Sequence, residues 1–310
     1  MRDEEGGVMN EVLSLGGDGW LLGGHPWQPD GPWFAVLGDP IAHSLSPLIQ
    51  NAALRERELD AVYLPARVQA GQLRRLKEGP AGRLLAGFNV TAPLKEAVSA
   101  LCDGRTDQAR DLGAVNTVRV QDGRWLGHNT DSGGILTVLS QAYSQAGGGQ
   151  GPAPRGVVLG AGGSARAAVD ALLRWEVPRI EVWNRSRQGR ERLRQWLQGR
   201  GLADRVRIGG LPSENPPADT QSSVYVCCLA GEVLCRGYLP DAAGAETSLL
   251  LDLRYGDQRP AEEAPLGFGF SDGLPVLMMQ GGLSFAWWHG PPVPWQAMRG
   301  ALDGALDNDL

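Results

Sequence analysis

The sequence predicts an α/β protein with two domains and mostly parallel strands, and three observations carry this prediction. Short apolar runs, typical of buried strands, alternate with stretches that have the composition of helices. A segment rich in glycine and proline at residues 147–152 has the composition of a flexible linker. The length of 310 residues is enough for two domains of ordinary size.

Before this linker, the chain is expected to start with an extension and to continue with alternating strands and helices. Residues 1–31 contain clusters of Gly, Pro and Asp, and we interpret them as a flexible N-terminal extension. Ser46 is expected to cap a helix that begins at Pro47, and another helix is expected over about residues 92–101. Asp122-Gly123 predicts a hairpin turn. The predicted strands cover residues 33–38, 61–68, 88–91, 117–120 and 124–126.

After the linker, the same alternation continues, as expected for a parallel sheet with crossover helices. A helix is predicted from Ser164 to about Trp175, and the chain is expected to be helical again from Leu274. The predicted strands cover residues 156–160, 179–183, 206–208, 224–229 and 248–253.

The bulk composition argues against several classes of protein. The net charge is −6 and no dense stripe of Lys and Arg occurs, so nucleic-acid binding is not expected. The start of the chain lacks the apolar core of a signal peptide, and no run of 18 apolar residues occurs, so no membrane span is expected.

The four cysteines and four histidines do not have the spacing of a zinc site, so no metal is expected. Cys227 and Cys228 lie in the apolar run 224–229, and we interpret them as small, buried hydrophobic residues. A reduced protein of the cytoplasm agrees with this cysteine usage.

A glycine-rich turn is the main signal in the second half. It matches the pattern G-x-G-x-x-A between a predicted strand and a predicted helix, which is the context that a dinucleotide-binding turn requires. The first glycine permits the tight turn, the second lets the backbone approach the pyrophosphate, and the helix start then faces the phosphates. The candidate cofactor residues of this turn are Gly160, Ala161, Gly162, Gly163, Ser164 and Ala165.

The end of the next predicted strand favours NADP over NAD. Asn184, Arg185 and Ser186 follow that strand, and the Arg185 guanidinium suits the additional 2′-phosphate of NADP. Glu181 has about the right sequence distance for the ribose hydroxyl of NAD, but it lies before the end of the strand, where ligands bind.

Two residues are candidates for proton transfer. Lys95 is expected in the first turn of its helix, where the helix dipole favours loss of its proton. Asp131 could be a catalytic carboxylate or simply a helix N-cap, and these alternatives have similar weight. Ser44 and Ser46 place two hydroxyls beside a positive helix start, which suits a substrate carboxylate.

Six runs, in order from residue 33 to about residue 300, together resemble the shikimate dehydrogenase family. The matching runs are Gly38-Asp39-Pro40-Ile41-Ala42-His43-Ser44-Leu45-Ser46-Pro47, Asn89-Val90-Thr91-Ala92-Pro93-Leu94-Lys95, Gly113-Ala114-Val115-Asn116-Thr117, Asn129-Thr130-Asp131, the nucleotide motifs at Gly160 and Asn184-Arg185-Ser186, and Asp272-Gly273-Leu274 with Gln280 and Trp288-His289-Gly290.

The resemblance implies reversible, NADPH-dependent reduction of 3-dehydroshikimate to shikimate, a step toward the aromatic amino acids. It implies a substrate-binding catalytic domain at residues 32–131 and 275–310 and a Rossmann-type NADP-binding domain at residues 132–274. Lys95 and Asp131 match the catalytic pair, and Gly273 matches a position near the nicotinamide. The residues that match substrate-binding positions are Ser44, Ser46, Asn89, Thr91, Asn116, Tyr255 and Gln280.

One run departs from the family pattern and keeps alternatives open. Val226-Cys227-Cys228-Leu229 stands where the family has Asn-Ala-Thr-Ser, so polar donors near the cofactor are lost. A dehydrogenase that also oxidises quinate, or a non-catalytic paralogue that binds shikimate or the nucleotide, are the alternative interpretations. We expect a monomer or a homodimer.

Overall fold

The computed structural model describes residues 12–17, 19–211, 221–229, 235–240, 247–255 and 268–308. The chain forms two compact units, the first from Met1–Thr130 and Gln280–Leu310 and the second from Asp131–Met279. The sequence predicted nearly the same division, with boundaries at residues 131/132 and 274/275. Asp131 and residues 275–279 therefore lie on the opposite side of the boundary from the one predicted.

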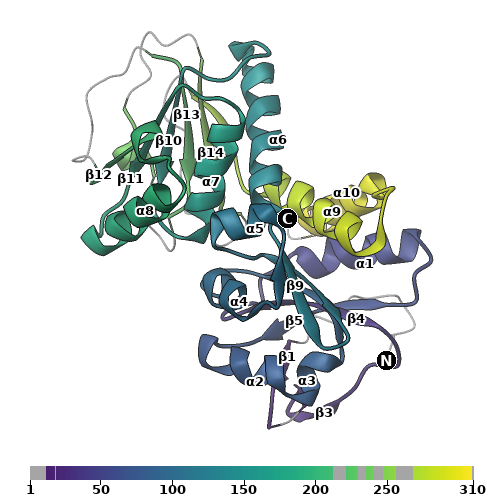
Figure 1. Ribbon diagram of the computed structural model, residues 1–310. Helices are drawn as coiled ribbons and strands as arrows, with labels where there is room; N and C mark the ends of the chain where they lie inside the picture. Colours follow the sequence, from purple (N-terminus) through teal and green to yellow (C-terminus); the bar gives the residue numbers. More distant parts are fainter. Residues whose placement is uncertain are drawn as a thin grey trace. The chain divides into compact units, whose positions relative to one another are not determined.

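The first unit is built on a nine-stranded mixed sheet with the order β3-β2-β1-β5-β4-β6-β8-β9-β7 (Figure 1). The strands β1, β5, β4 and β6 are parallel, and β8 pairs with β6 in the antiparallel direction. The predicted hairpin is confirmed as β8 and β9. The strands are β1 (Leu13–Leu15), β2 (Trp20–Leu22), β3 (His25–Trp27), β4 (Trp33–Gly38), β5 (Val62–Arg67), β6 (Leu85–Val90), β7 (Gly104–Arg105), β8 (Thr117–Gln121) and β9 (Arg124–His128).

The prediction of a flexible extension at residues 1–31 is wrong for residues 13–27, which form three strands of this sheet. β1 pairs in parallel with β5, and Trp20 is only 1% exposed. The Trp20 ring packs edge-on against Trp33 with the ring centroids 5.1 Å apart, and its indole N–H donates to the carbonyl of Ala81 at 3.0 Å. The glycine clusters that suggested a loop are the turns between these short strands, as at Gly23 and Gly24.

Helices cover the first unit, and two of their features differ from the prediction. The helix at Ser46 begins with Ser46 itself, while Leu45 occupies the N-cap position. Trp295–Asn308 forms an additional helix that packs against α1. The helices are α1 (Ser46–Glu56), α2 (Leu73–Glu78), α3 (Pro80–Arg83), α4 (Lys95–Leu101), α5 (Asp107–Leu112), α9 (Leu274–His289), which spans the boundary between the units, and α10 (Trp295–Asn308).

The second unit has a six-stranded sheet with the order β12-β11-β10-β13-β14-β15, and all its neighbouring strands are parallel. This is the strand order of the doubly wound dinucleotide-binding fold, so the predicted Rossmann-type architecture is confirmed. β15 was not predicted. The elements are α6 (Asp131–Tyr143), β10 (Arg155–Leu159), α7 (Gly163–Arg174), β11 (Arg179–Trp183), α8 (Arg187–Gly199), β12 (Val206–Gly209), β13 (Ser223–Cys227), β14 (Ser248–Asp252) and β15 (Phe268–Ser271).

The alternation of side chains divides the core of the second unit between the two faces of its sheet. Val158 and Val226 point to one face, where they join apolar residues of α6, α7 and α8. Leu159 and Cys227 belong to a smaller cluster that also includes Cys235. Among the described residues, no helix is long and apolar enough to cross a membrane.

The cysteine prediction is partly wrong. Cys227 is fully buried, as expected, but it forms a disulfide with Cys235 instead of remaining a free thiol. Cys228 is half-buried and takes no part in a disulfide. A disulfide between residues that are eight positions apart in the sequence depends on the path of the chain between them, which an apolar pattern does not report.

Candidate functional site

Several predicted substrate-binding residues of the first unit meet at one edge of its sheet. Ser44 and Ser46 follow β4, whereas Thr91 and Lys95 follow β6. Because β4 and β6 are parallel neighbours, their carboxyl ends lie at the same edge. The antiparallel strand β8 begins there as well, since Asn89 pairs with Thr117.

A buried network of amide and hydroxyl groups lies beside this edge. The Tyr63 hydroxyl donates to Asn89 Oδ1 at 2.8 Å. Asn89 Nδ2 lies 3.0 Å from each of three acceptors, which are the Asn116 carbonyl oxygen, Thr117 Oγ1 and Ser284 Oγ. Asn89 is 5% exposed and Ser284 is completely buried, so these bonds form in a region without solvent.

Asn116 extends the network to Gln280. Its Nδ2 donates to Thr130 Oγ1 at 2.9 Å and to Gln280 Oε1 at 3.3 Å. Its Oδ1 accepts from the backbone N–H of Thr130 at 2.8 Å and from the hydroxyl of Thr117 at 2.9 Å. The Ser284 hydroxyl, one turn after Gln280 on α9, donates to the Gln280 carbonyl at 2.9 Å.

The amides of Asn89 and Asn116 are therefore engaged within the protein. The family resemblance assigns both to ring hydroxyls, and this role stays a prediction beside their internal hydrogen bonds. The predicted functional residues did not include four further members of the network, Tyr63, Thr117, Thr130 and Ser284. Thr117 and Thr130 lie inside motifs that had been recognised, whereas only packing brings Tyr63 and Ser284 to the network.

The start of α1 presents two hydroxyls. Ser44 Oγ accepts from the backbone N–H of Ser46 at 3.3 Å, so Ser44 has part of the capping role predicted for Ser46. Ser44 is half-buried and Ser46 is 7% exposed. The positive end of the helix dipole adds to these groups and favours an anion here.

Lys95 is the first residue of α4 and is half-buried. Its carbonyl accepts from the backbone N–H of Val115 at 3.0 Å, which ties the start of α4 to the segment that carries Asn116. The prediction that Lys95 lies in the first helical turn is confirmed.

Asp131 belongs to the second unit and is 8% exposed. It is the first residue of α6, where a carboxylate is stabilised by the helix dipole. The next residue, Ser132, donates from its hydroxyl to Asp170 Oδ2 at 2.7 Å, and the Arg200 guanidinium lies 3.4 Å from Asp170 Oδ1. These contacts fix the first turn of α6. The pairing of Lys95 with Asp131 stays a prediction.

The glycine turn connects β10 to α7 in the second unit. Gly160 has a φ of +121°, a conformation that favours glycine, and a Cβ at this position would lie 3.0 Å from the carbonyl oxygen of Cys228. Gly162 is the N-cap of α7, and Ala165 is completely buried against the sheet side of the helix. The amide groups at the start of α7 are thereby left to face a phosphate.

The motif after β11 lies beside this turn. The Gly160 N–H donates to the Trp183 carbonyl at 2.9 Å, and Ser186 caps α8 by accepting from the Gly189 N–H at 3.0 Å. Gly189 approaches so closely that an added Cβ would lie 2.4 Å from Asn184 Nδ2 and 3.4 Å from Ala161 Cβ.

Charged groups at the end of β11 agree with the predicted preference for NADP. Arg185 is exposed, and its carbonyl accepts from Arg190 Nη1 at 2.9 Å, so Arg190 braces the backbone that carries Arg185. Glu181 is engaged inside the sheet, 3.1 Å from Arg155 Nε and 2.8 Å from Arg179 Nη2. Burial alone would raise the pKa of Glu181, but the hydrogen bond and the charge of Arg155, aided by Arg179, hold this pKa below its usual value.

Gly273 and Tyr255 complete the carboxyl edge of the second sheet. Gly273 follows β15, its N–H donates to the Arg254 carbonyl at 3.1 Å, and an added Cβ would lie 2.2 Å from the Leu253 carbonyl oxygen. Tyr255 follows β14 and is half-buried. The ends of the parallel strands of this unit thus carry the predicted cofactor residues, as in other doubly wound sheets.

Comparisons with known proteins agree with this arrangement. Residues 36–118 match the model of the shikimate dehydrogenase substrate binding domain. The NADP(+) shikimate dehydrogenase of Aquifex aeolicus is 32% identical over 84% of this chain and 93% of its own length. That of Anaeromyxobacter sp. is 36% identical over 87% of this chain and 95% of its own length.

The crystal structure of the Thermus thermophilus shikimate 5-dehydrogenase in complex with NADP(H) and shikimate is 32% identical. It matches with a TM-score of 0.69 over 89% of this chain and 100% of its own. Because the sequence similarity extends over most of both chains, it includes the substrate-domain motifs as well as the nucleotide-binding motifs. The chain belongs to the shikimate dehydrogenase family.

Proposed function

We propose that this protein catalyses the reversible, NADP-dependent interconversion of 3-dehydroshikimate and shikimate. The observation that carries the proposal is the similarity to NADP(+) shikimate dehydrogenases over most of the chain, with both sets of motifs present. The alternation of strands and helices is evidence for the fold alone. The evidence for the reaction comes from the side chains at the two sheet edges.

In this proposal the first unit binds the cyclic hydroxy-acid. Ser44 and Ser46, at the start of α1, bind its carboxylate, and Tyr255 contributes to the same end of the substrate. The ring hydroxyls are bound by Asn89, Thr91, Asn116 and Gln280. Internal hydrogen bonds hold the amides of Asn89 and Asn116 in position. A rigid set of donors and acceptors suits a substrate that carries several hydroxyls in fixed positions.

The second unit binds NADP. The turn from Gly160 to Ala165 and the start of α7 face the pyrophosphate, while Asn184, Arg185 and Ser186 face the adenosine ribose and its 2′-phosphate. Gly273 lies near the nicotinamide in this proposal, and its close approach to the Leu253 backbone excludes a side chain at this position. The nicotinamide of NADPH, when bound, supplies the hydride.

Proton transfer is assigned to Lys95, with Asp131 as its partner. In the reduction, the Lys95 ammonium donates a proton to the substrate oxygen that becomes the C3 hydroxyl, and in the oxidation its amine takes this proton back. The Asp131 carboxylate orients Lys95 and stabilises its charged form. This pairing requires the two units to bring both residues to the same substrate.

Initial rates with two acids and two cofactors test the proposal. We expect the fastest change in nicotinamide absorbance with shikimate and NADP, and slower rates with quinate or with NAD. A higher rate with quinate would identify the alternative substrate. Absence of turnover with all four combinations, in a protein that still binds shikimate, would point to the non-catalytic paralogue.

We also propose that the protein works in the cytoplasm, where the NADP pool that the reaction requires is available, and that it does so as a monomer or a homodimer. Size-exclusion chromatography with light scattering distinguishes these two states.

A further inference from the structure

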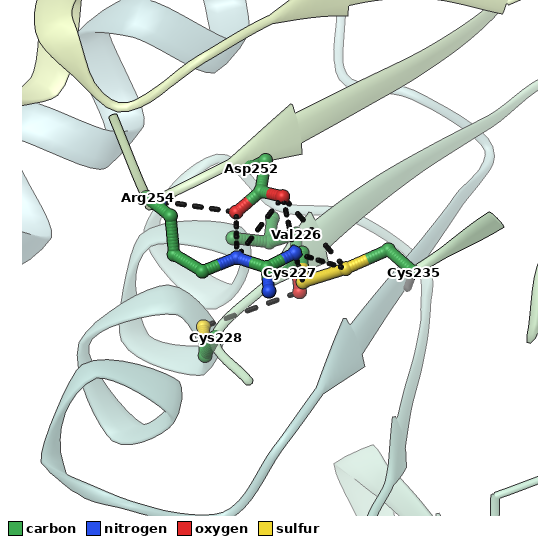
Figure 2. Close-up of a disulfide and its surroundings, with 6 residues drawn as sticks. All are labelled: Val226, Cys227, Cys228, Cys235, Asp252 and Arg254. Carbon is green, nitrogen blue, oxygen red and sulfur yellow. Dashed lines mark hydrogen bonds and ion pairs between the residues drawn. A yellow bond between two sulfur atoms is a disulfide. The ribbon is translucent and has the colours of Figure 1, made fainter. Parts of the chain in front are cut away.

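The disulfide of the second unit lies at the carboxyl end of a central strand (Figure 2). Cys227 is the last residue of β13, and Cys235 follows eight positions later. Both cysteines are completely buried. Neither has a role in the reaction proposed above, so the purpose of this bond is a separate question.

The disulfide ties a peripheral segment to one face of the sheet. Cys235 is followed by the short helical turn Arg236–Tyr238 and then by Leu239, which is 5% exposed. The small apolar cluster on this face consists mainly of strand residues. Among the described residues, its buried members from outside the strands are Cys235 and Leu239. The apolar residues of α6, α7 and α8 belong to the other cluster.

One end of the disulfide is connected to the glycine turn. The Cys228 N–H donates to the Leu159 carbonyl at 2.8 Å, directly before Gly160. The Cys228 carbonyl oxygen would lie 3.0 Å from a Cβ at Gly160, so the backbone after Cys227 packs against the first residue of the turn. A displacement of the backbone at the end of β13 would therefore act directly on the first residue of the glycine turn.

Arg254 connects the disulfide to Gly273. Its Nη2 lies 3.2 Å from Cys235 Sγ and 2.7 Å from Asp252 Oδ2 (Figure 2). Its carbonyl accepts from the Gly273 N–H at 3.1 Å. The same arginine thus contacts a sulfur of the disulfide and positions the backbone at the start of α9.

The surroundings of the sulfurs favour thiol chemistry over metal binding. Cys227, Cys235 and Asp252 place three possible ligand atoms within 4.8 Å of one another. However, the guanidinium of Arg254 already pairs with Asp252 and contacts Cys235, so a divalent cation would have to displace a buried positive charge. The same guanidinium would stabilise a thiolate at Cys235, which is the reactive form in disulfide exchange.

We propose that Cys227 and Cys235 form a redox-sensitive disulfide that controls nucleotide binding by the second unit. The oxidised pair holds the segment at 235–239 on the sheet and keeps the glycine turn and the Gly273 backbone in their binding positions. Reduction releases that segment and weakens the binding of NADP. This inference rests on the proposed function in one respect, namely that the second unit binds NADP.

The chemical step is exchange with a dithiol. A thiolate of the dithiol attacks one sulfur, the Cys227–Cys235 bond breaks, and a mixed disulfide forms. The second thiol of the reductant then displaces the protein thiolate and closes its own disulfide. The protein gains two electrons and two protons, and the dithiol loses the same number.

Because both cysteines are buried, exchange requires a transient local opening that exposes a sulfur to the dithiol. Thermodynamic linkage then requires that a ligand which binds the oxidised form more tightly also protects it from reduction by the same factor. NADP+ should therefore raise the ratio of reduced to oxidised dithiothreitol that is needed to reduce half of the protein.

The experiment compares full-length protein purified without reductant, before and after treatment with dithiothreitol, by calorimetric titration with NADP+. We expect the Kd for NADP+ to increase by about tenfold on reduction, a typical size for coupling between sites. Alkylation followed by mass spectrometry establishes the state of each cysteine. Cys235→Ser should show the weaker Kd before treatment and should not respond to dithiothreitol.

A matched variant, Cys228→Ser, separates the disulfide from general effects of thiols. Cys228 takes no part in the disulfide, and its Sγ lies 4.0 Å from the Val226 carbonyl oxygen (Figure 2), so this variant should keep the response to dithiothreitol. Equal Kd values for the oxidised and reduced protein would overturn the switch and leave the proposed function standing. If neither form binds NADP+, both proposals fail, and if alkylation finds Cys227 and Cys235 free after oxidation, only the switch fails.

Discussion

In the first unit the carboxyl edge of the sheet is built mainly from side chains, whereas in the second unit it is built mainly from backbone. Asn89 and Asn116 hold the first edge together through amide and hydroxyl bonds. Gly160 and Gly273 shape the second edge because they carry no side chain. The difference follows from the ligands, since hydroxyls on a ring need donors and acceptors in particular directions, while phosphates need backbone N–H groups at a helix start.

The two units also differ in their buried polar groups. The network of the first unit is neutral, consisting of amides and hydroxyls around Asn89. The second unit buries the ion pairs Arg155–Glu181 and Arg254–Asp252. Losing one partner of a buried neutral hydrogen bond is destabilising, and a buried charge that loses its partner costs more. The first unit therefore holds its buried polar groups by neutral hydrogen bonds, and the second holds its own largely by ion pairs.

The largest effect is expected at Lys95. Replacing Lys95 with Ala removes the group that exchanges a proton with the substrate, so kcat should decrease by at least ~100-fold while KM for shikimate changes little. Lys95→Arg keeps the positive charge but cannot exchange a proton near neutral pH, and it should be nearly as slow. Steady-state kinetics measure both variants. Near-normal turnover of Lys95→Ala would remove Lys95 from the mechanism.

The next effect tests the neutral network. Asn89→Ala removes the acceptor of the Tyr63 hydroxyl bond and the donor to Thr117 and Ser284 in a buried region, which should lower the free energy of unfolding by about 2–4 kcal/mol. Urea denaturation measures this change. Gln296→Ala removes an amide that is exposed on α10 and should cost less than about 1 kcal/mol. Equal losses in the two variants would contradict the importance of the buried network.

A pair of glycines on α8 tests the backbone packing of the second unit. Gly189→Ala would place a Cβ 2.4 Å from Asn184 Nδ2 and 2.8 Å from Ser186 Oγ, and displacing the Ser186 cap of α8 should cost about 0.5–2 kcal/mol and weaken NADP binding. Gly199→Ala meets no atom within 4 Å and should instead stabilise the helix by about 0.5 kcal/mol. Thermal unfolding and the Kd for NADP+ distinguish the two. The comparison fails if Gly189→Ala behaves like Gly199→Ala.

The smallest effect concerns acid sensitivity, which should begin at higher pH in the first unit. Burial, with the positive charges of Arg57 and Arg119, lowers the pKa of His289 from 6.5 to about 4. Between pH 6.5 and about pH 4, His289 is protonated in the unfolded chain but neutral in the folded chain. The free energy of unfolding therefore decreases as pH falls through this range. Glu181, whose pKa is lowered from 4.5, keeps its contribution until pH falls below that value.

Thermal unfolding between pH 7 and pH 5 measures this difference. The native protein should lose more stability over that range than His289→Gln, which has no titrating group at the position. Glu181→Gln should lose as much as the native protein between these pH values. A pH dependence that is identical in all three proteins would show that His289 does not control it.

Motifs with local geometry were predicted most fully. The turn at Gly160 follows from glycine positions between a strand and a helix, and the structure has the positive φ that this pattern demands. The hairpin at Asp122-Gly123 and the place of Lys95 in the first turn of its helix follow in the same way from neighbouring residues. Arg185 was also correctly placed after the end of β11, on an exposed surface.

Features that depend on distant segments were missed. The strands at residues 13–27 have too few residues to show a period, and they exist because β1 pairs with β5 and Trp20 packs against Trp33. The internal role of Asn89 depends on Tyr63 and Ser284, which approach it from other elements. The disulfide of Cys227 depends on the return of the chain at Cys235.

The sequence by itself determined most of the longer strands, the nucleotide turn and the family, because periodicity and turn chemistry act between residues that are close in the chain. Only the tertiary structure decided that Asn89 and Asn116 are held by protein groups, that the N-terminal segment joins the sheet, and that Cys227 is covalently bound to Cys235. These outcomes depend on which distant groups packing brings within bonding distance, and no local pattern encodes that distance.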